Sequence, residues 1–342
     1  MLIYDKVQAI SVMNKLGAKG IPFVFLIDFE MKKIIISTKL ENDGQLNFEM
    51  NGFSNHFSTS TICQPSYFET YPIDKSKYTE QFQTVKTEIQ RGNSFLLNLS
   101  SPTKVVTDLT IQDIYHSTDA KYKVYLKDEF VCFSPEIFVQ IKNGRIASFP
   151  MKGTIDANVQ NAESIILEDQ KELAEHFTIV DLIRNDLSRV AKKVNVDRFR
   201  YIDRITTSKK DLLQVSSEVS GMLPEDYTST IGSILFNLLP AGSISGAPKL
   251  KTLEIIQQAE GQERGYYTGI CGHFDGKNLD SGVMIRYIEK VNDELYYRSG
   301  GGITSMSEMG LEYQEMLDKV YLPISITAES KVTKQHLTSN GN

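Results

Sequence analysis

The sequence predicts an α+β fold built from large antiparallel sheets. Short β-rich segments at 122–150 and again at 266–300 are separated by charged or glycine-containing turns, which is typical of antiparallel meanders. Other segments repeat apolar residues every three or four positions, as amphipathic helices do. With 342 residues, 41% of them hydrophobic and 23% charged, the chain can bury a substantial core.

The first 75 residues predict one helix and two strands. Helical spacing runs through 6–16, and the apolar segments 22–29 and 32–38 are separated by a short polar turn. The stretch 41–75 is polar and has little periodicity, so no regular structure is predicted there.

Three further helices follow from apolar spacing. The first covers 78–92 and ends at a glycine, the second covers 170–190, and the third begins near Leu311. Lys152 is expected just past the last strand of the first meander, in a turn. Taken alone, a lysine beside a glycine in a turn is an ordinary solvated surface residue.

Composition excludes several classes of function. The net charge of -6 is spread without long blocks of one sign, so we expect no nucleic-acid partner and no polybasic membrane contact. The N-terminus mixes charges among its apolar residues and no apolar stretch is long enough to span a membrane, which predicts a cytoplasmic protein. Three widely spaced cysteines indicate reduced thiols rather than a disulfide framework.

Two Glu-x-x-Glu pairs are candidate metal ligands. Glu172 and Glu175 share one face of a predicted helix, and Glu312 and Glu315 share a face of another, with Lys319 four residues further on. If the helices faced each other, the four carboxylates would require a cation such as Mg2+. The alternative is that these pairs are common solvated patterns and that Lys319 forms an ordinary intrahelical ion pair.

Two other motifs do not have the pattern that a functional site would require. The loop 242–249 lacks the spacing of a P-loop, because only three residues separate its glycines and Ala-Pro precedes Lys249. Cys271 lies in an alternating strand segment, so we interpret it as a packed thiol and not as the nucleophile of a glutaminase. Any glutaminase would therefore be a separate subunit.

Five motifs in order resemble the chorismate-binding enzyme family, over about 78–323. They are SPE at 134–136, PMKGT at 150–154, KELAEHFTIVDLIRNDLSRV at 171–190, GSISGAPK at 242–249, and GGGI followed by EYQE at 300–315. The resemblance implies the fold of anthranilate synthase component I, with two large antiparallel sheets packed face to face and helices outside. It divides the chain into a short N-terminal lobe (1–77) completing that fold, a catalytic region (78–325) and a polar tail (326–342).

The resemblance also implies a set of site residues. Glu175 and Glu315 would hold Mg2+ with the ring carboxylate of chorismate, supported by Glu172 and Glu312. The positions expected to bind substrate are Thr154, Ser243, Tyr267, Arg286 in a strand, Gly300, Gly301, Gly302 and Lys319.

Lys152 decides the branch of the family that the chain resembles. Anthranilate-forming members usually carry Pro-Ile-Ala-Gly-Thr where this chain has PMKGT, and a lysine there marks the aminodeoxychorismate branch. The resemblance implies that Lys152 attacks the ring as a covalent nucleophile while Glu136 acts as general acid. The implied function is component I of aminodeoxychorismate synthase, which uses chorismate and ammonia from a separate glutaminase subunit to supply 4-aminobenzoate for folate.

The alternative to this function is anthranilate synthase component I. Two departures from the family pattern bear on the choice. Gln214 stands where many members have the histidine associated with pyruvate elimination, and Leu96 stands where many have glutamine. Isochorismate-forming members use a lysine at the position of Leu96, and leucine cannot activate water. No tryptophan-binding motif is evident, so we expect no inhibition by tryptophan.

Overall fold

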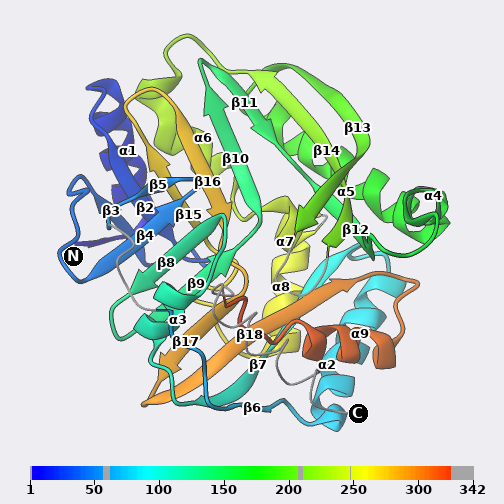
Figure 1. Cartoon of the computed structure of the whole chain (residues 1–342). Coiled ribbons are helices and arrows are strands. Elements are labelled where there is room, and N and C mark those ends of the chain that lie inside the picture. The colour runs from blue at the N-terminus through cyan, green and yellow to red at the C-terminus, as the bar shows by residue number, and fades with distance from the viewer. Residues whose placement is uncertain (1, 57–61, 207–210, 247, 325–342) are drawn as a thin grey trace.

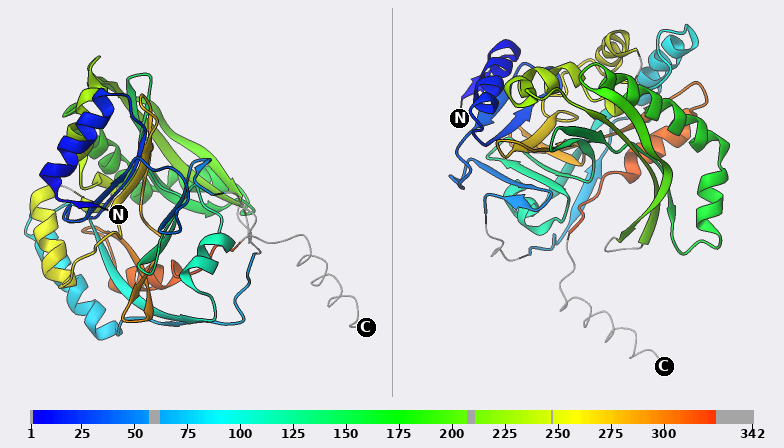
Figure 2. Two further views of the ribbon diagram at one scale, coloured as in Figure 1. Left: turned by 90° about the vertical axis from the view of Figure 1, so that its left-hand side faces the viewer. Right: turned by 90° about the horizontal axis from the view of Figure 1, so that it is seen from above.

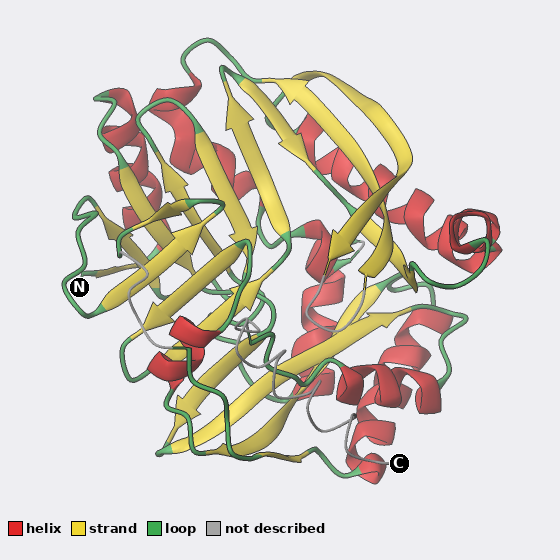
Figure 3. Cartoon of the chain, in the orientation of Figure 1, coloured by secondary structure: helices red, strands yellow, loops and turns green. Residues whose placement is uncertain are grey.

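A computed structural model describes residues 2–56, 62–206, 211–246 and 248–324. The expected polar tail, 326–342, lies outside these residues. The strands form two sheets in which all pairings are antiparallel, as predicted. Helices cover the outside of the strands (Figure 3).

The larger sheet has ten strands (Figure 1). In spatial order they are β1 (Ile3–Tyr4), β3 (Ile34–Ser37), β2 (Phe23–Ile27), β15 (Ile270–Phe274), β16 (Leu279–Val283), β10 (Ile137–Lys142), β11 (Arg145–Ser148), β14 (Asp211–Met222) and β12 (Met151–Asp156), with β13 (Lys192–Thr206) also paired to β14.

The smaller sheet has eight strands. In spatial order they are β5 (Phe53–Ser54), β4 (Leu46–Met50), β8 (Tyr122–Leu126), β9 (Phe130–Ser134), β17 (Tyr287–Val291), β18 (Glu294–Ile303), β7 (Leu97–Thr107) and β6 (Phe68–Tyr71).

The helices lie mainly on the outer side of the sheets, where Figure 2 shows α1, α8 and α2 in blue, yellow and cyan. The helical segments of the described residues are α1 (Lys6–Ala18), α2 (Lys75–Gln90), α3 (Ile111–Ser117), α4 (Ala162–Glu168), α5 (Gln170–Ser188), the 3-10 turn η1 (Tyr227–Thr230), α6 (Ile231–Leu238), α7 (Gly242–Ser245), α8 (Lys249–Glu260) and α9 (Met309–Asp318). None of them is long and apolar enough to cross a membrane.

Each predicted meander is divided between the two sheets, which corrects the sequence interpretation. β8 and β9 belong to the smaller sheet, whereas β10 and β11 belong to the larger one. The second meander divides in the same way between β16 and β17. The chain changes sheet three times: between β3 and β4, at the start of β10, and at the residues before β17.

The polar stretch 41–75 forms three strands that sequence periodicity did not predict. The short strands β4 and β5 lie at one edge of the smaller sheet, and the short strand β6 lies at the other edge. β4 pairs with β8 along five residues and β6 pairs with β7 along four. Pairing with strands distant in sequence stabilises these segments, which is a contribution that local propensity does not contain.

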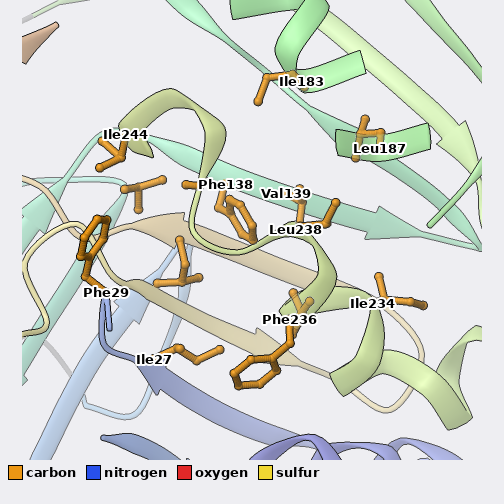
Figure 4. Packing of buried hydrophobic residues seen from close by; sticks show 14 of the residues in the cluster. Ile27, Phe29, Phe138, Val139, Ile183, Leu187, Ile234, Phe236, Leu238 and Ile244 are labelled. Carbon is orange, nitrogen blue, oxygen red and sulfur yellow. The ribbon is translucent and has the colours of Figure 1, made fainter. Parts of the chain in front are cut away.

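The main hydrophobic core lies between the larger sheet and its helices. Strand residues Ile27 and Phe138 pack against residues of α5, α6 and α7, including Ile183, Phe236 and Ile244 (Figure 4). A second core lies between the sheets and joins residues of β2 and β15 to residues of β4, β8 and β9. This second layer supports the face-to-face packing that the sequence analysis expected.

Gly246 is a position where the fold requires glycine. Its φ is +70°, and a Cβ atom would lie 1.6 Å from the carbonyl oxygen of Leu96. We expect Gly246→Ala to destabilise the protein by about 3 kcal/mol or more, because both the backbone and the contact would have to shift. Chemical denaturation measures the loss. Gly261→Ala, with φ +68° and nothing within 4 Å, is the matched control and should cost about 1 kcal/mol. Equal losses in the two variants would contradict the role of the Leu96 contact.

Candidate active site

A cavity of about 520 Å³ opens between the strands and helices that carry the predicted site residues. Figure 1 shows the main elements around it, which are β12, α5, β18 and α9. Every site residue predicted from the sequence lines this cavity: Glu136, Lys152, Thr154, Glu172, Glu175, Ser243, Tyr267, Arg286, Gly300, Gly301, Gly302, Glu312, Glu315 and Lys319.

The sequence predicted Lys152 in a turn just past the last strand of the first meander. In the structure Lys152 lies inside a further strand, β12. The register with β14 shifts between Met151 and Thr154, and Gly153 has a φ of +83°. Such an irregularity redirects side chains from the regular alternation of a strand. The Lys152 side chain lines the cavity, and its Nζ lies 3.3 Å from Glu175 Oε2.

The wall opposite this amine is formed by the glycines of β18. A Cβ atom on Gly302 would lie 3.3 Å from Lys152 Nζ and 3.1 Å from Leu96 Cδ1. A larger residue at Gly302 would therefore crowd the amine. The glycine run keeps this part of the cavity open beside Lys152.

Glu136 lies at the crossing between the sheets from β9 to β10, directly before β10. Its Oε1 accepts a hydrogen bond of 2.6 Å from the Ser243 hydroxyl, and its backbone carbonyl accepts one from Val283 N. Burial raises the pKa of Glu136 above its ordinary value, although the Ser243 bond and the charge of Lys152 act in the opposite direction. A raised pKa favours the protonated carboxyl group that a general acid needs.

Two helices bring four carboxylates to the cavity. Asp169 caps the start of α5, since its Oδ1 accepts from Glu172 N at 2.8 Å. The next turn of α5 is held by His176, which is fully buried with its Nε2 2.7 Å from Ser217 Oγ in β14. These contacts orient the face of α5 that carries Glu172 and Glu175.

The second helix, α9, contributes the other two carboxylates. The Ser299 hydroxyl of β18 donates to the carbonyl of Met316 at 2.9 Å and so ties α9 to the sheet. A Cβ atom on Gly301 would lie 3.2 Å from Glu312 Oε2 and 3.5 Å from Glu315 Oε1. Only a residue without a side chain leaves this space beside the carboxylates.

These carboxylates could supply some of the ligands of a hard divalent cation. Their oxygens are the ligands that Mg2+ takes in proteins, and Gly301 leaves room beside two of them. In the described part of the chain, however, no three His, Cys, Asp or Glu side chains converge into a metal site by themselves. Ligands from a bound carboxylate or water would have to complete the coordination.

Positive charge lines the cavity as well. Lys319 Nζ lies 2.6 Å from Glu315 Oε1 and donates to the Gly300 carbonyl at 2.8 Å. Arg286 was expected in a strand, but it lies between β16 and β17 with a φ of +54°. The correction has a physical reason, because the chain changes sheets here and the backbone must leave the extended conformation.

A protein-family model described as chorismate binding enzyme matches residues 20–325. The chain belongs to the chorismate-binding enzyme family.

Two relatives that match over nearly their whole length are described only as uncharacterized PabA-like proteins. A protein of Haemophilus influenzae described as an uncharacterized PabA-like protein is 52% identical over 317 residues, which cover 92% of this chain and 96% of that protein.

Two relatives whose descriptions name an activity are less similar. Anthranilate synthase component 1 of Acetivibrio thermocellus is 34% identical, and aminodeoxychorismate synthase component 1 of Bacillus subtilis is 30% identical. Each alignment covers 73% of this chain, but only 52% and 55% of the respective relative. This chain therefore spans about half the length of these synthases.

Solved structures of the family share the fold. Anthranilate synthase component I of Streptococcus pneumoniae superposes with a TM-score of 0.64 and 26% identity, covering 76% of this chain and 60% of that one. The menaquinone-specific isochorismate synthase of Escherichia coli gives a TM-score of 0.71 at 15% identity, covering 93% and 82%. The second likeness concerns the fold alone.

The two departures from the family pattern also line the cavity. Leu96 lies beside the glycine wall near Lys152, and Gln214 of β14 is the antiparallel partner of Thr154. Sequence reasoning missed the polar lining residues Asn98 of β7, Ser148 of β11, and Arg298 and Ser299 of β18. No sequence signal separates a polar residue that faces the cavity from one that faces solvent or the core in these strands.

Proposed function

We propose that this chorismate-binding enzyme is component I of an aminodeoxychorismate synthase, which replaces the C4 hydroxyl of chorismate by an amino group. The observation that carries the proposal is the position of Lys152. Its primary amine lines the cavity between Glu175 and the glycines of β18, and its charge acts on Glu136. A nucleophile and an acid therefore share one cavity.

The proposed first step forms a bond from Lys152 Nζ to C2 of the ring. The two ring double bonds shift, the C4 hydroxyl leaves, and Glu136 supplies the proton that makes it water. Lys152 must lose its own proton for this attack, and Glu175 Oε2 is within 3.3 Å to accept it. The step is a substitution and consumes no oxidant or reductant.

In the proposed second step ammonia forms a bond to C4. The double bonds return, Lys152 leaves C2, and the excess proton of the new amine is released. The net reaction exchanges hydroxyl for amine and produces water. Leu96 beside Lys152 offers no group that could activate water as a competing nucleophile.

The proposed cofactor is Mg2+, held by Glu175 and Glu315 with support from Glu172 and Glu312. Its chemistry would be to neutralise the ring carboxylate of chorismate among these glutamates. The enzyme's own charges support this arrangement, since Lys319 lies against Glu315 and the Gly300 carbonyl.

Removing the metal should stop turnover. We expect EDTA to reduce amination by at least about 10²-fold, because Lys152 and Lys319 alone would then offset four carboxylates that face an anionic substrate. Steady-state rates before and after EDTA, and after adding Mg2+ in excess, measure the effect. Full activity in the presence of EDTA would contradict the metal assignment.

The proposed source of ammonia is a separate glutaminase subunit. Cys271 is fully buried in β15, and burial raises its pKa to about 12, so it has none of the features of a reactive thiolate. The product would supply 4-aminobenzoate for folate after a lyase removes pyruvate.

The reaction product tests the proposal directly. Purified protein is incubated with chorismate, Mg2+ and excess ammonium, with and without an added aminodeoxychorismate lyase. We expect 4-aminobenzoate only when the lyase is present. Anthranilate formed without lyase would instead establish anthranilate synthase component I, and unchanged chorismate would indicate a binding protein that has kept the fold.

A further inference from the structure

Arg298 is a buried cation of the cavity wall that the proposed chemistry leaves without a role. It is 8% exposed and lies in β18, two residues before Gly300 on the same face of the strand. Its Nε and Nη2 both lie 2.6 Å from a single atom, Glu289 Oε1 in β17. Glu289 therefore binds one edge of the guanidinium group.

The other edge of Arg298 is not satisfied by the protein. Its Nη1 is buried and has no hydrogen-bond partner among the residues that the structure describes. A buried donor without a partner is costly, and for a charged group the cost is larger. A guanidinium group has five donors in a planar fork that suits a carboxylate in two places.

Arg286 adds a second cation with the same property. Its guanidinium carbon lies 5.5 Å from the centre of the Tyr321 ring, and its Nε also lacks a hydrogen-bond partner within the described ranges. No ion pair joins Arg286 to a carboxylate of the described residues. Arg286 and Arg298 carry two positive charges and Glu289 offsets one of them, so this part of the wall is positively charged.

Arg286 and Arg298 lie close together in the fold, because Tyr287, which follows Arg286, is the antiparallel partner of Arg298. Burial raises the pKa of Tyr267 to about 12, while the charges of Arg286 and Arg298 both act to lower it. Both arginines and this tyrosine line the cavity. Along β18, Arg298 is four residues, or roughly 13 Å, from Gly302, and the amine of Lys152 lies beside Gly302. Arg298 thus lies away from the end of β18 that holds Lys152.

We propose that Arg298 is a second arginine of a carboxylate subsite, which binds the side-chain carboxylate of the substrate together with Arg286 and Tyr267. Glu289 is a positioning residue that holds Arg298 by one edge and leaves the other edge to the ligand. This inference rests on the proposed substrate, chorismate, and not on its amination.

Binding measured without turnover tests the subsite. Calorimetric titration with chorismate and Mg2+, in the absence of ammonia, compares wild type with Arg298→Gln and Arg298→Lys. We expect the dissociation constant to rise about 10- to 100-fold in Arg298→Gln and less in Arg298→Lys, which keeps the charge but not the fork. Competition with 4-hydroxybenzoate, which carries only a ring carboxylate, should be unchanged.

Two matched variants separate binding from structural stabilisation. Glu289→Gln breaks the same ion pair but keeps Arg298, so it should weaken chorismate much less than Arg298→Gln does. Arg145→Gln removes another strand arginine that is paired with two carboxylates, Asp197 and Glu218, outside the cavity, and should leave affinity unchanged.

The inference is overturned if Arg298→Gln binds chorismate as wild type does, if both ligands weaken by the same factor, or if Glu289→Gln loses as much selectivity as Arg298→Gln. These outcomes are distinct from failure of the proposed function. Wild-type protein that binds chorismate but does not aminate it would refute the amination and leave the subsite test intact.

Discussion

Lys152→Ala should abolish amination of chorismate, lowering kcat by at least about 10³-fold, which corresponds to about 4 kcal/mol of transition-state stabilisation. The amine of Lys152 is the group proposed to form the bond to C2, and no other lysine lies beside the glycines of β18 within the described cavity wall except Lys319, which is held by Glu315 and Gly300. Truncation therefore removes the nucleophile without a substitute.

Intact mass spectrometry distinguishes a nucleophile from a merely electrostatic lysine. Wild-type protein incubated with chorismate and Mg2+, but no ammonia, should gain the mass of chorismate minus one water. Lys152→Ala should gain nothing, whereas Lys142→Ala, which alters an exposed lysine at the end of β10, should form the adduct normally. Adduct of equal abundance in wild type and Lys152→Ala would refute the covalent mechanism.

The elements that sequence analysis predicted well are those whose signal is local. α1, α2, α5 and α9 each bury one face, so their apolar spacing alone indicated them. The assignment of strands to sheets was wrong because it depends on crossings such as that of Arg286, where one residue with positive φ redirects the chain. Local β-propensity contains no information about which sheet a strand joins.

The candidate site also contains residues that sequence motifs indicated and residues that only the tertiary structure brings together. Family motifs nominated Lys152, Glu136 and the four glutamates, and the fold brings all of them to one cavity. Arg298 and Glu289 lie in ordinary strands nine residues apart in sequence, and only the hairpin of β17 and β18 makes them an ion pair. Their relation is a property of tertiary structure, so no motif could have indicated it.

Glu136→Gln should lower the rate of adduct formation about 10²- to 10⁴-fold, the usual contribution of a positioned general acid. Glutamine keeps the size of the side chain and can still bond the Ser243 hydroxyl, but it has no acidic proton for the departing C4 hydroxyl. Stopped reactions analysed by intact mass give the rate without ammonia, whose own titration would otherwise enter the pH profile. Chorismate affinity should change little, because Glu136 is not a proposed carboxylate-binding group.

The pH dependence of the same step tests the proton more directly. Adduct formation should fall as pH rises through the pKa of Glu136, since the acid must be protonated. The Ser243 hydrogen bond stabilises the charged form and so lowers that pKa. Ser243→Ala should raise it further, and the alkaline limb of the profile should move to higher pH, while Glu136→Gln should lose this limb. A limb that stays in place in Ser243→Ala and persists in Glu136→Gln would assign the proton transfer to another group.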